Sequence, residues 1–146
     1  MSDSKVFFFT EDIEFSFGYE QSVKEWLDDV VSSEQNSLNS ANIIFCSDDY
    51  ILKINQEHLS HDYYTDIITF PLMDFGSPIE TDIFISIDTV RSNASKLHVG
   101  FDQELFRVIV HGFLHLLGYD DKTLDDQRVM RSKENYYLEY FESHFR

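Results

Sequence analysis

The chain has 146 residues, which is enough to bury a core without disulfides, and its length predicts a single domain over residues 1–146. Hydrophobic residues make up 42% of it and aromatic residues 16%, which excludes disorder, and no apolar run approaches the roughly 20 residues that span a bilayer. The net charge of −16 argues against nucleic-acid binding over an extended surface, because a strongly acidic surface repels phosphates.

The single cysteine and the N-terminus bear on the cellular compartment. One cysteine cannot form an internal disulfide, and the apolar run at residues 6–9 is too short for a secretory signal. We therefore expect a cytoplasmic protein with no membrane contact. Cys46 lies in an apolar, strand-like segment and is expected to be a small core residue rather than a nucleophile or a metal ligand.

The first half of the chain predicts three strands and two helices. Apolar patterning typical of strands occurs at Val6–Thr10, Glu14–Phe17 and Ala41–Ser47. Ser22 precedes a run of apolar residues with helical period. After the third strand, Asp48 or Asp49 is expected to cap a short helix.

The middle of the chain contains the two clearest strands. Asp66–Phe70 and Thr81–Ile87 are rich in β-branched and aromatic residues, which favour sheets. The loop between them holds Gly76 and both prolines of the chain. A helix is expected to follow Asp88.

The last third of the chain predicts two helices. Asp102 is expected to cap the first of them, which is apolar nearly all round from Leu105 to Leu117 and should therefore be buried. The segment Thr123–Asp126 resembles a capping box that opens a final amphipathic helix. Strands first and helices later predict an α+β domain, with a small mixed sheet of about four strands, helices packed over it and the buried apolar helix at its centre.

Four residues in and after this buried helix suggest a metal site. His111 and His115 lie four positions apart, so a helix places both imidazoles on one face. Gly118 follows, and glycine can end a helix in the left-handed conformation without a steric penalty. The reversed chain can then bring Asp121 back toward the histidines. Two histidines and one carboxylate form a known catalytic zinc set that leaves the fourth position to water.

The alternative is that both histidines are ordinary core residues with hydrogen-bonded rings. The buried helix favours a metal, because each nitrogen of a buried imidazole needs a partner. Gly112 within the helix also suggests that a substrate or another backbone approaches closely there. The spacing resembles the HExxHxxGxxH motif of metzincin peptidases, but Gly112 replaces the glutamate that activates water, which argues against peptide hydrolysis.

Cationic residues gather near the motif despite the acidic composition. Four of them follow it and one precedes it by a helical turn: Lys122, Arg128, Arg131, Lys133 and Arg107. They either form a basic rim beside the metal or belong to an ordinary solvated helix face.

The motif resembles that of the YbeY family, whose signature is HGxLHLxGYDH. Residues 111–121 agree with it at ten of eleven positions, counting two wildcards. The family segment that ends in PTDVLSF is similar to Asn55–Phe70, and its GDIxIS strand is similar to Thr81–Ser86, which Asn93 and Ala94 follow. The resemblance covers roughly residues 41–134.

This resemblance implies a metal-dependent, single-strand endoribonuclease that acts in maturation of the 3′ end of small-subunit ribosomal RNA and in ribosome quality control. The implied partners are ribosomal RNA and a small-subunit ribosomal protein or GTPase. His111, His115 and Asp121 would hold one Zn²⁺ and form the catalytic centre. Asp120 is either a base or partner of the site or a residue that bonds the helix end, and Arg107 is a candidate to steady charge on phosphate.

Two departures from the family pattern affect this expectation. Asp121 stands where the family has a third histidine, so the ion would be a weaker Lewis acid and another divalent ion could replace zinc. Leu59 stands where the family has an arginine, which removes a bidentate phosphate partner. His58 and His61 are either phosphate donors or exposed loop residues. The alternative functions are a weakly catalytic or non-catalytic ribosome-assembly factor with a structural metal, and a zinc hydrolase acting on another substrate.

Overall fold

A computed structural model describes residues 5–58 and 65–145, so Leu59 and His61 lie outside the described residues. Its strands are β1 (Val6–Thr10), β2 (Leu38–Cys46), β3 (Ile67–Pro71) and β4 (Ile79–Ser86). Its helices are α1 (Glu20–Ser33), α2 (Asp48–His58), α3 (Ile87–Leu97), α4 (Phe101–Leu116) and α5 (Leu124–His144).

The described strands form one mixed sheet in the order β1-β2-β4-β3. Strands β1, β2 and β4 run parallel, and β3 pairs antiparallel with β4. The parallel pairs are joined through helices, as parallel strands require, whereas β3 and β4 form a hairpin. The predicted α+β class with a small mixed sheet is therefore confirmed.

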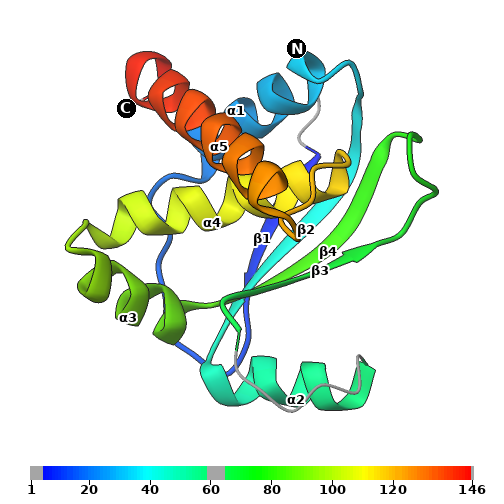
Figure 1. Ribbon diagram of the computed structural model, residues 1–146. Coiled ribbons are helices and arrows are strands. Elements are labelled where there is room, and N and C mark those ends of the chain that lie inside the picture. Colours follow the sequence, from blue (N-terminus) through cyan, green and yellow to red (C-terminus); the bar gives the residue numbers. More distant parts are fainter. Residues whose placement is uncertain (1–4, 59–64, 146) are drawn as a thin grey trace.

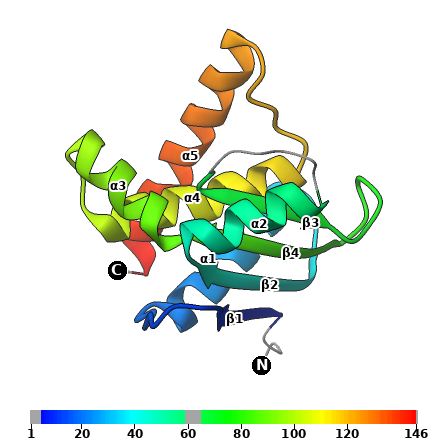
Figure 2. The same cartoon turned by 90° about the horizontal axis from the view of Figure 1, so that it is seen from below.

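The sheet lies between two layers of helices. In Figure 1, α4 crosses above the sheet with α5 over it, and α2 lies below; Figure 2 shows α2 from its own side. The main core fills the space between the sheet and helices α1, α4 and α5, and it includes Trp26, Ile83 and Phe113. A smaller cluster under α2 contains Cys46, Ile51 and Ile68, which confirms Cys46 as a core residue.

Helix α4 is buried along most of its length, as its apolar sequence predicts. Ten of its residues are buried, among them Leu105, Ile109 and Leu114. The helix begins at Phe101 with Gly100 as its N-cap, so the prediction that Asp102 caps it was wrong. No helix in the described part of the chain is both long and apolar enough to cross a membrane.

The predicted strand at Glu14–Phe17 was wrong. This segment is irregular, and its aromatic rings pack against the first two strands: Phe15 lies 5.0 Å from the Phe45 ring and Phe17 lies 5.2 Å from the Phe8 ring, centroid to centroid. The alternation of apolar residues therefore reflects aromatic packing of an irregular segment rather than pairing in a sheet.

Three helix starts can be compared with the expectations. Helix α1 begins at Glu20, before Ser22, and α3 begins at Ile87, before Asp88, because the Ser86 hydroxyl accepts a hydrogen bond from the Thr89 amide at 3.2 Å. Helix α5 begins after the predicted capping box, in which the side chains of the first and last residues of Thr123–Asp126 accept each other's backbone amides.

Candidate metal centre

The structure brings the three predicted ligands together. The Nε2 atoms of His111 and His115 lie 3.6 and 3.3 Å from Oδ2 of Asp121. One ligand atom from each residue lies within 4.8 Å of the others, and within the described residues this group consists of these three side chains. Two neutral imidazole nitrogens and a carboxylate oxygen suit a divalent metal ion, and three protein ligands are the number typical of a catalytic zinc site.

A left-handed turn returns the chain from α4 to the histidines. Gly118 has φ +107°, and its amide donates to the His115 carbonyl at 3.0 Å, while the Tyr119 amide donates to the Leu114 carbonyl at 3.0 Å. These bonds satisfy the terminal carbonyls of the helix and reverse the chain. The turn thereby places Asp121 beside the imidazoles that precede it, as the spacing predicts.

Gly112 faces the hairpin strand β3 rather than open space. A Cβ added there would lie 2.7 Å from Cδ1 of Ile67 and 3.2 Å from Cγ2 of Thr69. The expected close approach at this position is therefore real, and side chains of β3 make it. Glycine at this position lets α4 lie close to the sheet.

Glu134 lies in the candidate site, and the sequence-based prediction missed it. Its Oε2 lies 2.6 Å from Nδ1 of His111, and its Oε1 accepts a hydrogen bond from Nη1 of Arg107 at 2.8 Å. Glu134 is only 4% exposed. A carboxylate on Nδ1 fixes the ring and leaves Nε2 as the nitrogen that can hold a metal, as in other carboxylate–histidine–metal arrangements.

His111 and Glu134 stabilise each other's charged forms. Burial alone would lower the pKa of His111, but the hydrogen bond and charge of Glu134, with the charges of Asp121 and Asp66, raise it above its usual range. Burial alone would raise the pKa of Glu134, yet the hydrogen bonds from His111 and Arg107 lower it. The carboxylate is therefore ionised at neutral pH and increases the basicity of the ring.

Two further carboxyl groups, the partly buried Asp66 and the buried Glu104, lie near His111 and Glu134. Burial raises the pKa of Asp66, the residue before β3, against the opposing charge of His111. Burial likewise raises the pKa of Glu104 in the first turn of α4, against the opposing charge of Arg107. The inner side of the site is thus acidic and mostly withdrawn from water.

The predicted basic rim is divided in the structure. Arg107 and Arg131 both face Glu134, at 2.8 and 3.6 Å, so Arg107 lies on the Nδ1 side of His111 rather than beside the three converging ligand atoms. Lys122 and Asp120 are exposed next to Asp121 in the loop that follows α4.

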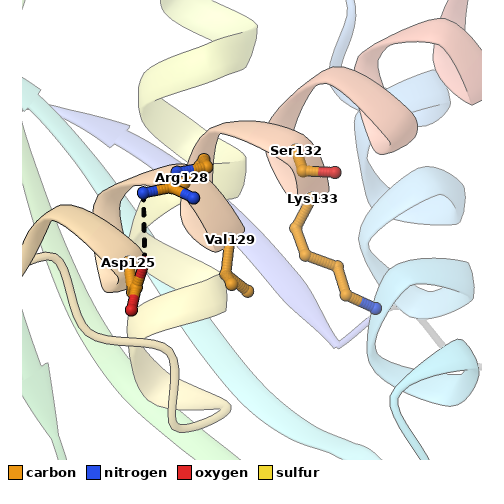
Figure 3. A pocket seen from close by; sticks show the side chains of 5 residues that line it. All are labelled: Asp125, Arg128, Val129, Ser132 and Lys133. Atoms are coloured by element: carbon orange, nitrogen blue, oxygen red, sulfur yellow. Dashed lines mark ion pairs between the residues drawn. The ribbon is translucent and has the colours of Figure 1, made fainter.

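Arg128 and Lys133 line a surface pocket of about 400 Å³ on α5. Figure 3 shows Arg128 paired with Asp125 at one end, while Lys133 extends toward α1 at the other. Lys133 Nζ lies 5.5 Å from the centroid of the Tyr119 ring and 3.0 Å from Oε2 of Glu34. The pocket therefore adjoins the turn that carries Asp121.

Glu34 at the end of α1 joins this turn to α5. It accepts hydrogen bonds from the hydroxyl of Tyr119 at 2.6 Å, from the hydroxyl of Tyr137 and from Lys133. Burial alone would raise the pKa of Glu34, but these three donors lower it. Tyr119 is partly buried against the core, and its bond to Glu34 tethers the turn.

Comparisons with known proteins agree with this fold and identify the family. The family model described as Endoribonuclease YbeY matches residues 6–142. A protein of that name from Cytophaga hutchinsonii is 45% identical over 135 residues, which cover 92% of this chain and 94% of that protein. Another from Flavobacterium johnsoniae is 46% identical over 127 residues, covering 87% and 91%. A solution structure from Thermotoga maritima is 30% identical, with a TM-score of 0.67, and covers 93% of this chain and 88% of that one. The chain therefore belongs to the YbeY family.

Proposed function

We propose that this protein is a metal-dependent endoribonuclease that acts on ribosomal RNA, with His111, His115 and Asp121 as the ligands of one divalent ion. The observation that carries the proposal is the convergence of these three ligand atoms within 4.8 Å, in a chain whose relatives are named endoribonucleases. We further propose that residues 1–146 function as one domain, because the family model matches residues 6–142.

Zinc is the ion that we propose. Two imidazoles and one carboxylate are a zinc ligand set, although the carboxylate also tolerates harder divalent ions. When bound, such an ion supplies Lewis acidity that strengthens water as a nucleophile and withdraws charge from phosphate. Because Asp121 carries a negative charge, this Lewis acidity should be weaker than in a site with three histidines.

Side chains around the candidate metal site position the His111 ring and offer groups that can interact with the substrate. Glu134 holds the His111 ring through Nδ1, and Arg107 in turn holds Glu134. Asp120, exposed beside Asp121, is the candidate proton acceptor. Arg128 is exposed and is a candidate to bind an RNA phosphate. Its surface ion pair with Asp125 contributes little and would compete only weakly with the phosphate.

The acidity of the protein bears on its partners. With a net charge of −16, the isolated chain should bind naked RNA weakly, and a small-subunit ribosomal protein or GTPase that supplies basic surface would help to present the substrate. This partner proposal predicts that RNA affinity falls further as salt rises. Tight binding by the isolated protein that is insensitive to salt would contradict it.

The test of the central proposal compares wild type with Asp121→Ala. Metal content is measured by mass spectrometry, and cleavage is assayed on structured ribosomal RNA containing single-stranded ends. The proposal expects one ion per chain and RNA cleavage in wild type, both lost in Asp121→Ala, while the exposed Asp28→Ala on α1 retains both. Retained metal without cleavage by the wild type would refute the enzyme and favour an assembly factor with a structural metal.

A further inference from the structure

Phe75 is an exposed aromatic residue in the loop between β3 and β4. Its side chain is 80% exposed, the highest value among the exposed large hydrophobic residues of the described chain. Leaving a phenylalanine in water forgoes the favourable free energy of burying its ring. The fold does not need this ring for its core, so its position calls for another explanation.

An ordered turn presents the ring. The Ser77 amide donates to the Asp74 carbonyl at 3.0 Å, which closes a β-turn with Phe75 and Gly76 at its centre. Gly76 has φ +89°, a conformation that favours glycine at the third position of such a turn. At the base of the loop the Leu72 amide donates to the Glu80 carbonyl at 2.7 Å. The ring is thus displayed by a hydrogen-bonded loop.

The same ring lies against the turn of the candidate metal centre. A Cβ added to Gly118 would lie 2.9 Å from both Cε2 and Cζ of Phe75. Gly118 is three positions after His115 and three before Asp121. Three residues span at most about 10 Å of backbone, so the Cα atom of Gly118, against which the ring rests, lies within about 10 Å of the Cα atoms of both His115 and Asp121.

We propose that Phe75 is a stacking platform for an unpaired base of the RNA substrate near the metal centre. The inference rests on the proposed endoribonuclease function and adds a residue that binds substrate. Base–aromatic stacking contributes about 1–3 kcal/mol per base and tolerates any sequence. It also needs no positive charge, which suits a chain with a net charge of −16.

A platform of this kind selects single strands. Bases in a duplex are stacked on their neighbours and cannot lie on a protein ring, whereas bases in loops and ends can turn outward. The exposed face of Phe75 would accept such a base, while the ring edge rests on Gly118. Phe75 would therefore favour unpaired RNA at the metal centre without reading its sequence.

The experiment uses the full chain loaded with zinc and a fluorescein-labelled, single-stranded oligoadenylate RNA. Phe75→Ala should raise Kd and KM by about 5- to 150-fold, the equivalent of the stacking energy, and change kcat less than about twofold. Melting temperature and zinc content should stay at their wild-type values. The matched control is Leu124→Ala, which removes an apolar side chain that is 77% exposed at the start of α5.

A second variant reports stacking directly. Phe75→Trp should bind RNA at least as tightly as wild type, and the fluorescence of its new indole should be quenched when RNA is added. The native Trp26 is fully buried and gives a constant background. An unchanged Kd in Phe75→Ala, or no quenching in Phe75→Trp, would overturn the inference. Failure of the wild type to cleave RNA would instead refute the proposed enzyme, because binding and quenching are measured independently of cleavage.

Discussion

Replacing Glu134 with glutamine should weaken zinc binding by about 10- to 100-fold, the range found when a partner of a metal-bound histidine is removed. The carboxylate offers one oxygen to Nδ1 of His111 at 2.6 Å and the other to Arg107 at 2.8 Å. Glutamine keeps the volume of this buried side chain but has only one oxygen, so one of the two donors loses its acceptor. Glu134→Ala, which removes both acceptors, should lie at the upper end of the range.

The assay is a zinc competition titration against a chromophoric chelator, carried out at pH 8 and at pH 6. The metal binds neutral imidazole, so affinity falls as pH drops through the pKa of His111. Glu134 raises that pKa in the metal-free protein, so protons compete more strongly in wild type than in Glu134→Gln. The dissociation constant of Glu134→Gln divided by that of wild type should therefore be larger at pH 8 than at pH 6.

Glu139→Gln is the matched control, because it removes the same charge from an exposed position on α5. It should leave zinc affinity within about twofold of wild type, since an exposed charge is largely screened. If Glu134→Gln bound zinc as tightly as Glu139→Gln at pH 8, the idea that Glu134 orients His111 for the metal would be refuted.

Three further outcomes follow from the packing around the site. Glu34→Ala should lower the free energy of unfolding by about 1.5–3 kcal/mol at pH 7, because three donors lose a charged acceptor. In urea titrations, this difference from wild type should shrink as pH falls through the lowered pKa of Glu34, and a difference that does not shrink would contradict this account. Burial raises the pKa of the Cys46 thiol to about 12, so a thiol reagent at pH 8 should label the native protein far more slowly than the urea-unfolded chain; equal rates would show that the thiol is accessible. Gly118→Ala should destabilise the protein by about 1–3 kcal/mol, because Gly118 has a positive φ and an added Cβ would contact Phe75. Part of this destabilisation should disappear when Phe75 is also replaced by alanine. If the effects of the two substitutions on stability in thermal melts were strictly additive, the ring would not contact the turn.

The three candidate ligands could be found from the sequence because each depends on local geometry. An α-helix places His111 and His115 on one face wherever the helix lies, and Gly118 permits the left-handed turn that returns Asp121. The burial of α4 follows in the same way from a sequence that is apolar nearly all round. The helix boundaries were predicted less well: Gly100 rather than the expected Asp102 caps α4, and α3 begins at Ile87 rather than after Asp88.

Glu134 could not be paired with His111 from the sequence, since 23 positions separate them. A signal was nevertheless present. Met130, Tyr137 and Phe141 form the buried face of α5, and Glu134 shares that face. A carboxylate on an apolar helix face requires a buried partner, but only the packing of α5 against α4 shows which residue that partner is.

The sequence by itself determined the convergence of three candidate ligands, the buried central helix and the α+β class, because helical spacing and apolar periodicity are properties of neighbouring residues. Only the tertiary structure decided the strand order, the link from Arg107 through Glu134 to His111, and the position of Phe75 against Gly118. Those contacts join segments that are distant in the chain. They arise when the elements pack into one core, where the partner of each group depends on the whole arrangement.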